Sequence, residues 1–222
     1  MIDPTANVFE RLLVARPGAM LPGYDDAQDL PVEFRHTLTT GGLPVPAGMD
    51  ARYRASFGAV LRMVRLLYDS NVPLVAGTDG LPGFSLVHEL ELYESAGIPD
   101  TAILRIATIN AARTMHMDRE LGTISVGKRA DMIVVDDDPT QRISALRTVR
   151  TVIKGGAYYD VNALRAALGI GRPGGAAGDA ATACSGCSTH QARHITSPQR
   201  PSPTSARPVE GSGAATMGSI RH

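Results

Sequence analysis

The residue of this chain best placed to do chemistry is an aspartate at the end of an apolar run. The run extends from Val72 to Ala76 and is followed by Gly77, Thr78 and Asp79. Apolar residues bounded by proline and glycine are typical of a strand that is buried on both faces, as in a parallel sheet. Barrel enzymes hold their reacting groups at the C-terminal ends of such strands. Taken alone, an aspartate in this setting is more often the cap of the next helix.

Further motifs, which follow in order along the chain, favour the catalytic interpretation. Residues 121–136 have the sequence LGTISVGKRADMIVVD. The neighbouring motifs are HELELYESAGIP (88–99), ATINAARTM (107–115), DDDP (136–139) and VRTVIKGG (149–156). Together they resemble the C-terminal part of the amidohydrolase superfamily, in the branch of imidazolonepropionase-like and Xaa-Pro dipeptidase-like metal-dependent hydrolases. The resemblance covers residues 1 to about 160, with residues 2–5 similar to the segment after the sixth or seventh barrel strand.

The resemblance implies an α/β fold in three parts. Residues 1–118 would be the C-terminal part of a TIM-like (β/α)8 metal-dependent hydrolase barrel. Residues 119–168 would supply strands of a small β-sandwich and a terminal helix. Residues 169–222 contain almost no large apolar side chains. Such a segment cannot offset its ordering entropy by burial, so it is predicted to be a disordered, low-complexity tail.

Hydrophobic periodicity and turn residues predict the elements that position the aspartate. Residues 17–50 are rich in proline and glycine and are predicted to form a long loop over the barrel mouth. The predicted elements are a helix within 1–16, helices over 50–69, from the N-cap Ser85 to about Ala96 and from Asp100 to about Met115, and strands over 130–136 and 148–154.

The resemblance also implies a reaction, which is hydrolysis of a C–N bond assisted by one or two divalent metals, zinc above all. Such a metal lowers the pKa of a bound water and polarises the scissile carbonyl. Asp79 matches the carboxylate at the end of the last barrel strand, so it is predicted to be both a metal ligand and the catalytic acid–base group. His88 is predicted to orient substrate at the mouth, with a capping or packing role as the alternative.

The other metal ligands that the resemblance requires are not found in this sequence. The histidines stand at 36, 88, 116, 190, 194 and 222, and none forms a His-x-His pair. His36 lies in the Pro/Gly-rich segment and is a weak ligand candidate, while His116 is expected to be structural. Since a tightly held divalent metal needs three or four protein ligands, the chain is predicted to be the C-terminal piece of an amidohydrolase and inactive in isolation.

The sequence is compatible with two other functions. The chain could be a non-catalytic remnant or a subunit that needs an N-terminal partner. Alternatively, Cys184-x2-Cys187-x2-His190-x3-His194 could form a zinc-binding or redox interaction module. No apolar scaffold surrounds these tail residues, so ordinary tail sequence is the preferred explanation.

Composition narrows the classes of partner. The chain has 222 residues and a formal net charge of zero, which argues against binding to nucleic acid or to an anionic membrane. No apolar run approaches the roughly 18 residues of a membrane span, and the N-terminal sequence has no signal-peptide pattern. Both cysteines lie in the tail, so a cytoplasmic location is expected. The expected partners are a small amide or dipeptide-like substrate and either an N-terminal partner chain or a second copy.

Overall fold

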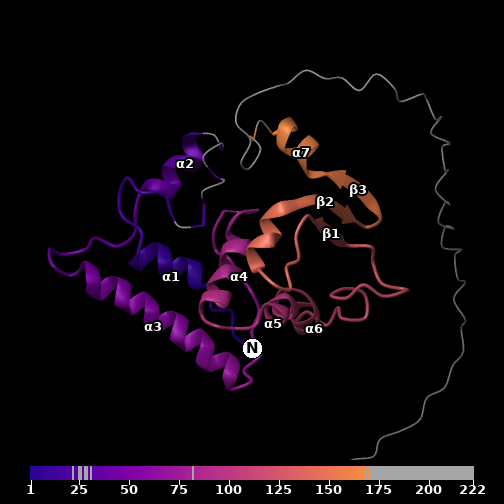
Figure 1. Cartoon of the computed structure of the whole chain (residues 1–222), viewed down its shortest axis with the longest axis horizontal. Coiled ribbons are helices and arrows are strands. Elements are labelled where there is room, and N and C mark those ends of the chain that lie inside the picture. The colour runs from indigo at the N-terminus through magenta and orange to yellow at the C-terminus, as the bar shows by residue number, and fades with distance from the viewer. Residues whose placement is uncertain are drawn as a thin grey trace, which may run out of the picture. The chain divides into compact units, whose positions relative to one another are not determined.

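Helices occupy most of the N-terminal two thirds of the described chain, and a small sheet follows them (Figure 1). The computed structural model describes residues 1–21, 23, 24, 27, 30, 32–81, 83–168 and 170. The helices are α1 (Ala6–Leu13), α2 (Val32–Thr39), α3 (Asp50–Asp69), α4 (Ser85–Ser95), α5 (Asp100–Arg105), the π-helical turn η2 (Ile106–Asn110), α6 (Ala111–Thr114), the 3-10 helix η3 (Ile143–Thr148) and α7 (Val161–Ala167). The strands are β1 (Met132–Val135), β2 (Val149–Lys154) and β3 (Ala157–Asp160). None of the described helices is both long and apolar enough to span a bilayer.

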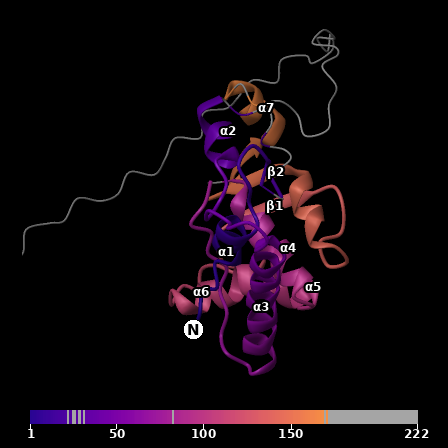
Figure 2. The same cartoon turned by 90° about the vertical axis from the view of Figure 1, so that its left-hand side faces the viewer.

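The predicted helix over residues 50–69 is confirmed by α3. Its buried face carries Phe57 and Val64, which recur at helical spacing. Asp50 lies in the first turn, where a carboxylate is favoured by the helix dipole. Its two carboxylate oxygens accept hydrogen bonds from Arg16 and Arg54, both at 2.8 Å. Helix α1 packs against both α3 and α4 (Figures 1 and 2).

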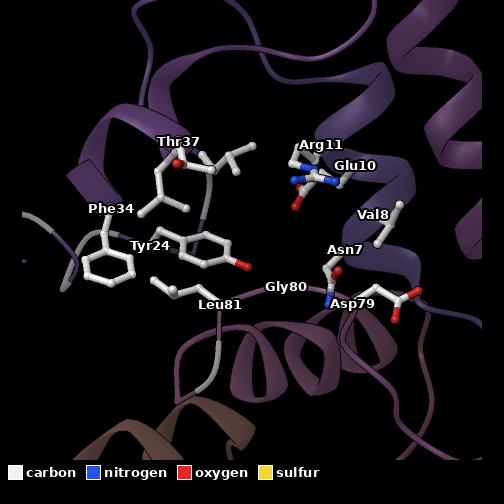
Figure 3. Close-up of a pocket in the computed structure, with 12 residues that line it drawn as sticks. Asn7, Val8, Glu10, Arg11, Tyr24, Phe34, Thr37, Asp79, Gly80 and Leu81 are labelled. Carbon is white, nitrogen blue, oxygen red and sulfur yellow. The ribbon is translucent and has the colours of Figure 1, made fainter.

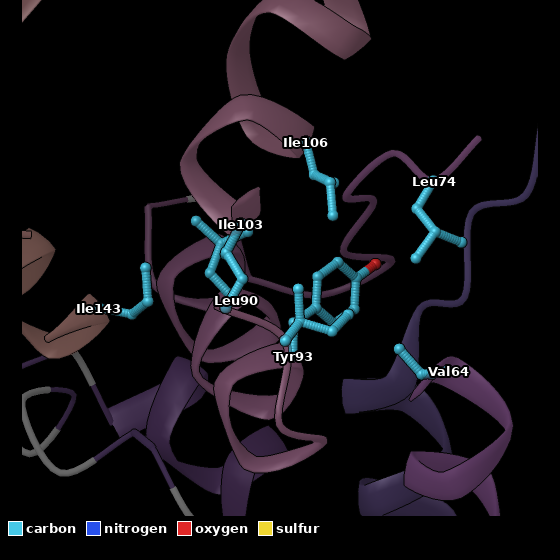
Figure 4. Packing of buried hydrophobic residues seen from close by; sticks show 8 residues of the cluster. Val64, Leu74, Leu90, Tyr93, Ile103, Ile106 and Ile143 are labelled. Atoms are coloured by element: carbon cyan, nitrogen blue, oxygen red, sulfur yellow. The ribbon is translucent and has the colours of Figure 1, made fainter. Parts of the chain in front are cut away.

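The helix predicted from Asp100 to about Met115 is confirmed, with one irregularity. Helices α5 and α6 are joined without a break by the π-helical turn η2. Ile103 and Ile106 point into the main core. This core also receives Val64 from α3, Leu90 and Tyr93 from α4, and Ile143 from η3 (Figure 4). Leu74, from the segment after α3, and Ile98, from the turn between α4 and α5, complete it.

The strands predicted over 130–136 and 148–154 are confirmed as β1 and β2. They pair antiparallel, with Met132 opposite Ile153, and β3 pairs antiparallel on the other side of β2. A two-residue turn, Gly155-Gly156, joins β2 to β3. Both glycines have positive φ angles, which this kind of tight hairpin requires and which other residues rarely adopt.

Three local predictions are corrected by the structure. Residues 72–76 form no regular strand and contribute only one parallel bridge, Ile2 with Leu74, because Pro73 has no N–H and Ile2 is the only ladder partner described. Residues 17–50 are not loop throughout, since α2 lies among them. The N-cap of α4 is Phe84, whereas the hydroxyl of Ser85 donates back to the Leu81 carbonyl.

Candidate functional site

Asp79 lies where the extended segment after Leu74 turns toward α4. Its backbone has a φ of 38°, in the left-handed region that Asp and Asn tolerate better than most residues. Its side chain is exposed and lines a cavity of about 280 Å³. Asp79 is therefore accessible to a small molecule in that cavity.

The cavity has one polar wall and one apolar wall. Helix α1 supplies Asn7, Glu10 and Arg11, whose spacing places them on the same side of the helix. Tyr24, Phe34 and Leu81 gather on the other side, and Asp79 lies at the same end as Asn7 (Figure 3). The remaining lining residues are Val8, Leu21, Thr37, Leu38 and Gly80. Such a cavity suits a small ligand that has a polar end and an apolar end.

Asn7 brings an unusual polar group to this cavity. The residue is only 6% exposed, and its Nδ2 has no hydrogen-bond partner among the described residues. Buried amide groups are nearly always hydrogen-bonded, so this donor is one that a polar ligand in the cavity could satisfy. Across the cavity, burial raises the pKa of the Tyr24 phenol, although a hydrogen bond with Ser85 opposes that effect.

His88 lies behind the polar wall, in a cluster of charged groups. Its Nε2 is 2.5 Å from Oε2 of Glu10, and its Nδ1 is 3.4 Å from Oε2 of Glu91. Arg147, from η3, donates two hydrogen bonds of 2.7 Å to the two carboxylate oxygens of Glu91. The ion pairs therefore join α1, α4 and η3. The four charged residues of this cluster line a second cavity of about 400 Å³, together with Gly23, Leu92 and Ser95.

The charges of this cluster control its protonation. Burial disfavours the charged imidazole, but hydrogen bonds to Glu10 and Glu91 outweigh it and raise the pKa of His88 to about 9. Burial likewise disfavours the charged carboxylate of Glu91, yet His88 and Arg147 together lower its pKa to about 2. His88 is therefore protonated at neutral pH and bound on both ring nitrogens. It does not line the Asp79 cavity, which only Glu10 of this cluster reaches.

The described residues do not fit a metal. No group of three or more His, Cys, Asp or Glu side chains among them comes close enough together to hold an ion. His36 is exposed on α2, and His116 is exposed after α6. The tail candidates Cys184, Cys187, His190 and His194 lie outside the described residues.

Comparison with known proteins identifies the family. Residues 55–158, which include Asp79, match the amidohydrolase family model. This segment belongs to the amidohydrolase superfamily. The match confirms the superfamily that the sequence predicted. It concerns a segment that corresponds to only part of a member of that superfamily.

Individual relatives match only in part. An imidazolonepropionase of Caldanaerobacter subterraneus subsp. tengcongensis is 36% identical over 98 residues, which cover 40% of this chain and 24% of the relative. A 5-methylthioadenosine/S-adenosylhomocysteine deaminase of Thermoanaerobacter pseudethanolicus is 30% identical over 101 residues, which cover 40% and 22%. A crystal structure of a Xaa-Pro dipeptidase with bound methionine aligns with a TM-score of 0.49 at 22% identity, over 71% of this chain and 34% of that one. The chain thus spans about a quarter of the length of the curated relatives it matches.

Sequence reasoning missed the residues that surround Asp79 and His88. Nothing in the sequence of α1 distinguishes Asn7 or Glu10 from ordinary polar residues of a surface helix. A buried polar residue on a helix face is recognisable only when the partner helix is known, and here the partner of Glu10 stands 78 positions later.

Proposed function

We propose that this chain carries the catalytic carboxylate of a hydrolase that acts on C–N bonds, and that Asp79 is that carboxylate. The observation that carries the proposal is the position of Asp79, inside the amidohydrolase segment and on the lining of a cavity with polar and apolar walls. In this role the carboxylate accepts a proton from the attacking water and returns it to the departing amine.

The proposal extends to the architecture. The parallel bridge between Ile2 and Leu74 is the contact expected between neighbouring strands of a (β/α)8 barrel. The sheet β1–β3 would be the part of a small β-sandwich that this chain contributes. Both interpretations rest on the family, since the described residues contain no closed barrel and no second sheet.

Hydrolysis also requires groups beyond those that the structure describes. The family implies a divalent metal, for which the described residues offer Asp79 and no ligand cluster. We therefore propose that the active form is an assembly in which a further polypeptide supplies the missing groups. The walls of the cavity favour a small amide or dipeptide-like substrate with an apolar side group, and His88 would hold the polar wall in place rather than touch the substrate.

The test uses the tagged full chain, purified under native conditions so that any partner is retained. Gel-filtration fractions are assayed for bound metal and for turnover of N-acyl amino acids, Xaa-Pro dipeptides and adenosine. We expect turnover only in fractions that contain a second polypeptide. Asp79→Asn should abolish this turnover, whereas Asp118→Asn, which changes an exposed aspartate outside the cavity, should leave it unchanged.

Two results would argue against the proposal. Undiminished turnover by Asp79→Asn would remove Asp79 from the reaction. A metal-free, folded chain without turnover in any fraction would favour a non-catalytic binding role instead.

A further inference from the structure

Two segments far apart in the sequence meet beside the turn that carries Asp79. The N–H of Ile2 donates to the Pro73 carbonyl at 2.8 Å, and the N–H of Val75 donates to the Ile2 carbonyl at 3.1 Å. This is the slanted hydrogen-bond pattern of a parallel ladder. In such a ladder the next N–H directed at the same neighbour is two residues further on, which is that of Gly77.

A side chain takes over the ladder at this point. The N–H of Gly77 donates to Oδ1 of Asp3 at 2.8 Å, where a regular strand would offer a main-chain carbonyl. The same oxygen accepts the N–H of Thr5 at 3.3 Å, which holds the carboxylate in place from its own side of the junction. The main chain can therefore leave the ladder after Ile2 to start α1, while residues 75–77 remain tied to it.

Gly77 is fitted to this carboxylate. A Cβ atom at position 77 would collide with Oδ2 and Cγ of Asp3. The φ angle of Gly77 is not in the left-handed region, so the close approach of Asp3, rather than the backbone conformation, requires glycine here.

The start of α1 fixes the other side of the junction. The two carboxylate oxygens of Glu89 accept the N–H groups of Ala6 and Asn7, each at 2.8 Å. Glu89 is fully buried on α4, the helix that follows the Asp79 turn. Asp3 is consequently held between a fixed helix start and the segment that leads into Asp79.

We propose that Asp3 is a positioning residue for Asp79, acting through the N–H of Gly77 two residues before it. Its functional meaning rests on the proposed role of Asp79 as the reacting carboxylate. The contact also explains why an acidic residue at position 3 accompanies a glycine at position 77. The carboxylate accepts the Gly77 N–H, and glycine leaves room for that carboxylate.

The first experiment measures residue-resolved hydrogen exchange in the full chain by mass spectrometry. Asp3→Ala is expected to lower the protection of the Gly77 amide at least about fivefold, the scale of one lost hydrogen bond. Protection of the amides of residues 78–81 should fall with it. Asp3→Asn keeps an acceptor oxygen and should restore most of the protection.

The matched control is Asp138→Ala. Asp138 accepts an N–H two residues on, from Thr140 at 2.9 Å, as Asp3 does from Thr5. It should leave residues 77–81 unchanged. An effect of Asp3→Ala that is confined to Gly77, or no effect at all, would overturn the positioning role.

The second experiment is a double-mutant cycle of melting temperatures. Gly77→Ala should lower the melting temperature because its methyl group meets Asp3, and adding Asp3→Ala should raise it again. Additive losses would contradict the proposed fit. Neither experiment needs turnover. If the chain proved to have no hydrolase activity while Asp3→Ala still loosened residues 77–81, the proposed function would fail and the coupling would stand.

Discussion

The ion pair between His88 and Glu10 should make the stability of this chain fall as the pH rises above neutral. Both side chains are almost completely buried, with 7% and 10% of their surfaces exposed. Glu10 faces the imidazole from α1, Glu91 from its own helix, Arg147 lies beyond Glu91, and the ring of Tyr24 meets it edge-on at 6.0 Å. The protonated imidazole is thus stabilised in the folded state and not in the unfolded chain.

The sign and size of the effect follow from the pKa of His88. The folded-state pKa of about 9 lies above the ordinary value of 6.5. Stabilisation is therefore complete below pH 6.5 and is lost as the pH rises through 9. At about 1.4 kcal/mol per pH unit, the loss in the free energy of unfolding is about 3 kcal/mol. The pKa of Glu91, at about 2, makes that residue contribute to changes only in acid, as the pH falls from 4.5 toward 2.

The assay is urea unfolding of the full chain between about pH 6 and about pH 10, for the wild type and for His88→Gln. Both proteins carry the same ionisable groups apart from His88, so the contributions of those shared groups cancel in the difference. That difference in unfolding free energy should shrink by about 3 kcal/mol from the lowest to the highest pH. The control is His116→Asn, an exposed histidine at a positive φ of 55° that Asn tolerates.

One result would refute this reasoning. If the difference between wild type and His88→Gln stayed constant across the range, His88 would not be a charged partner of Glu10 in the folded chain. A comparable slope for His116→Asn would point to a general charge effect instead.

Three further predictions concern other parts of the chain. Asp79→Asn should cut kcat of the active assembly by about a hundredfold or more. Because the side chain is exposed, the free energy of unfolding in urea should change by no more than about 0.5 kcal/mol, and a large stability loss would mean a structural role. Glu89→Gln should cost about 1–3 kcal/mol in urea unfolding, because one amide oxygen replaces two acceptors at the start of α1, and a loss as small as that of exposed Glu120→Gln would contradict this. Deleting residues 171–222, which lie outside the described residues, should leave the melting temperature unchanged. A decrease of more than about 1 kcal/mol in the free energy of unfolding would show that the tail docks.

The sequence alone determined the elements whose pattern is local. Helix α3, the helical stretch over residues 100–114 and the strands β1 and β2 were all predicted from periodicity and turn residues, and the structure confirms them. The motifs around residues 121–136 also indicated the superfamily, which the family match confirms. Such signals are carried by neighbouring residues, since the hydrogen bonds of a helix and the turn of a hairpin lie within one short segment.

Only the tertiary structure decided what surrounds Asp79. The apolar run before it has strand composition, but a strand forms only where other segments offer hydrogen-bond partners, and here Ile2 and the carboxylate of Asp3 are the partners described. The pairing of His88 with Glu10 joins helices that lie far apart in the sequence. A one-dimensional pattern states which face of a helix is polar. It does not state which distant carboxylate that face will meet, because the meeting depends on how the whole core packs.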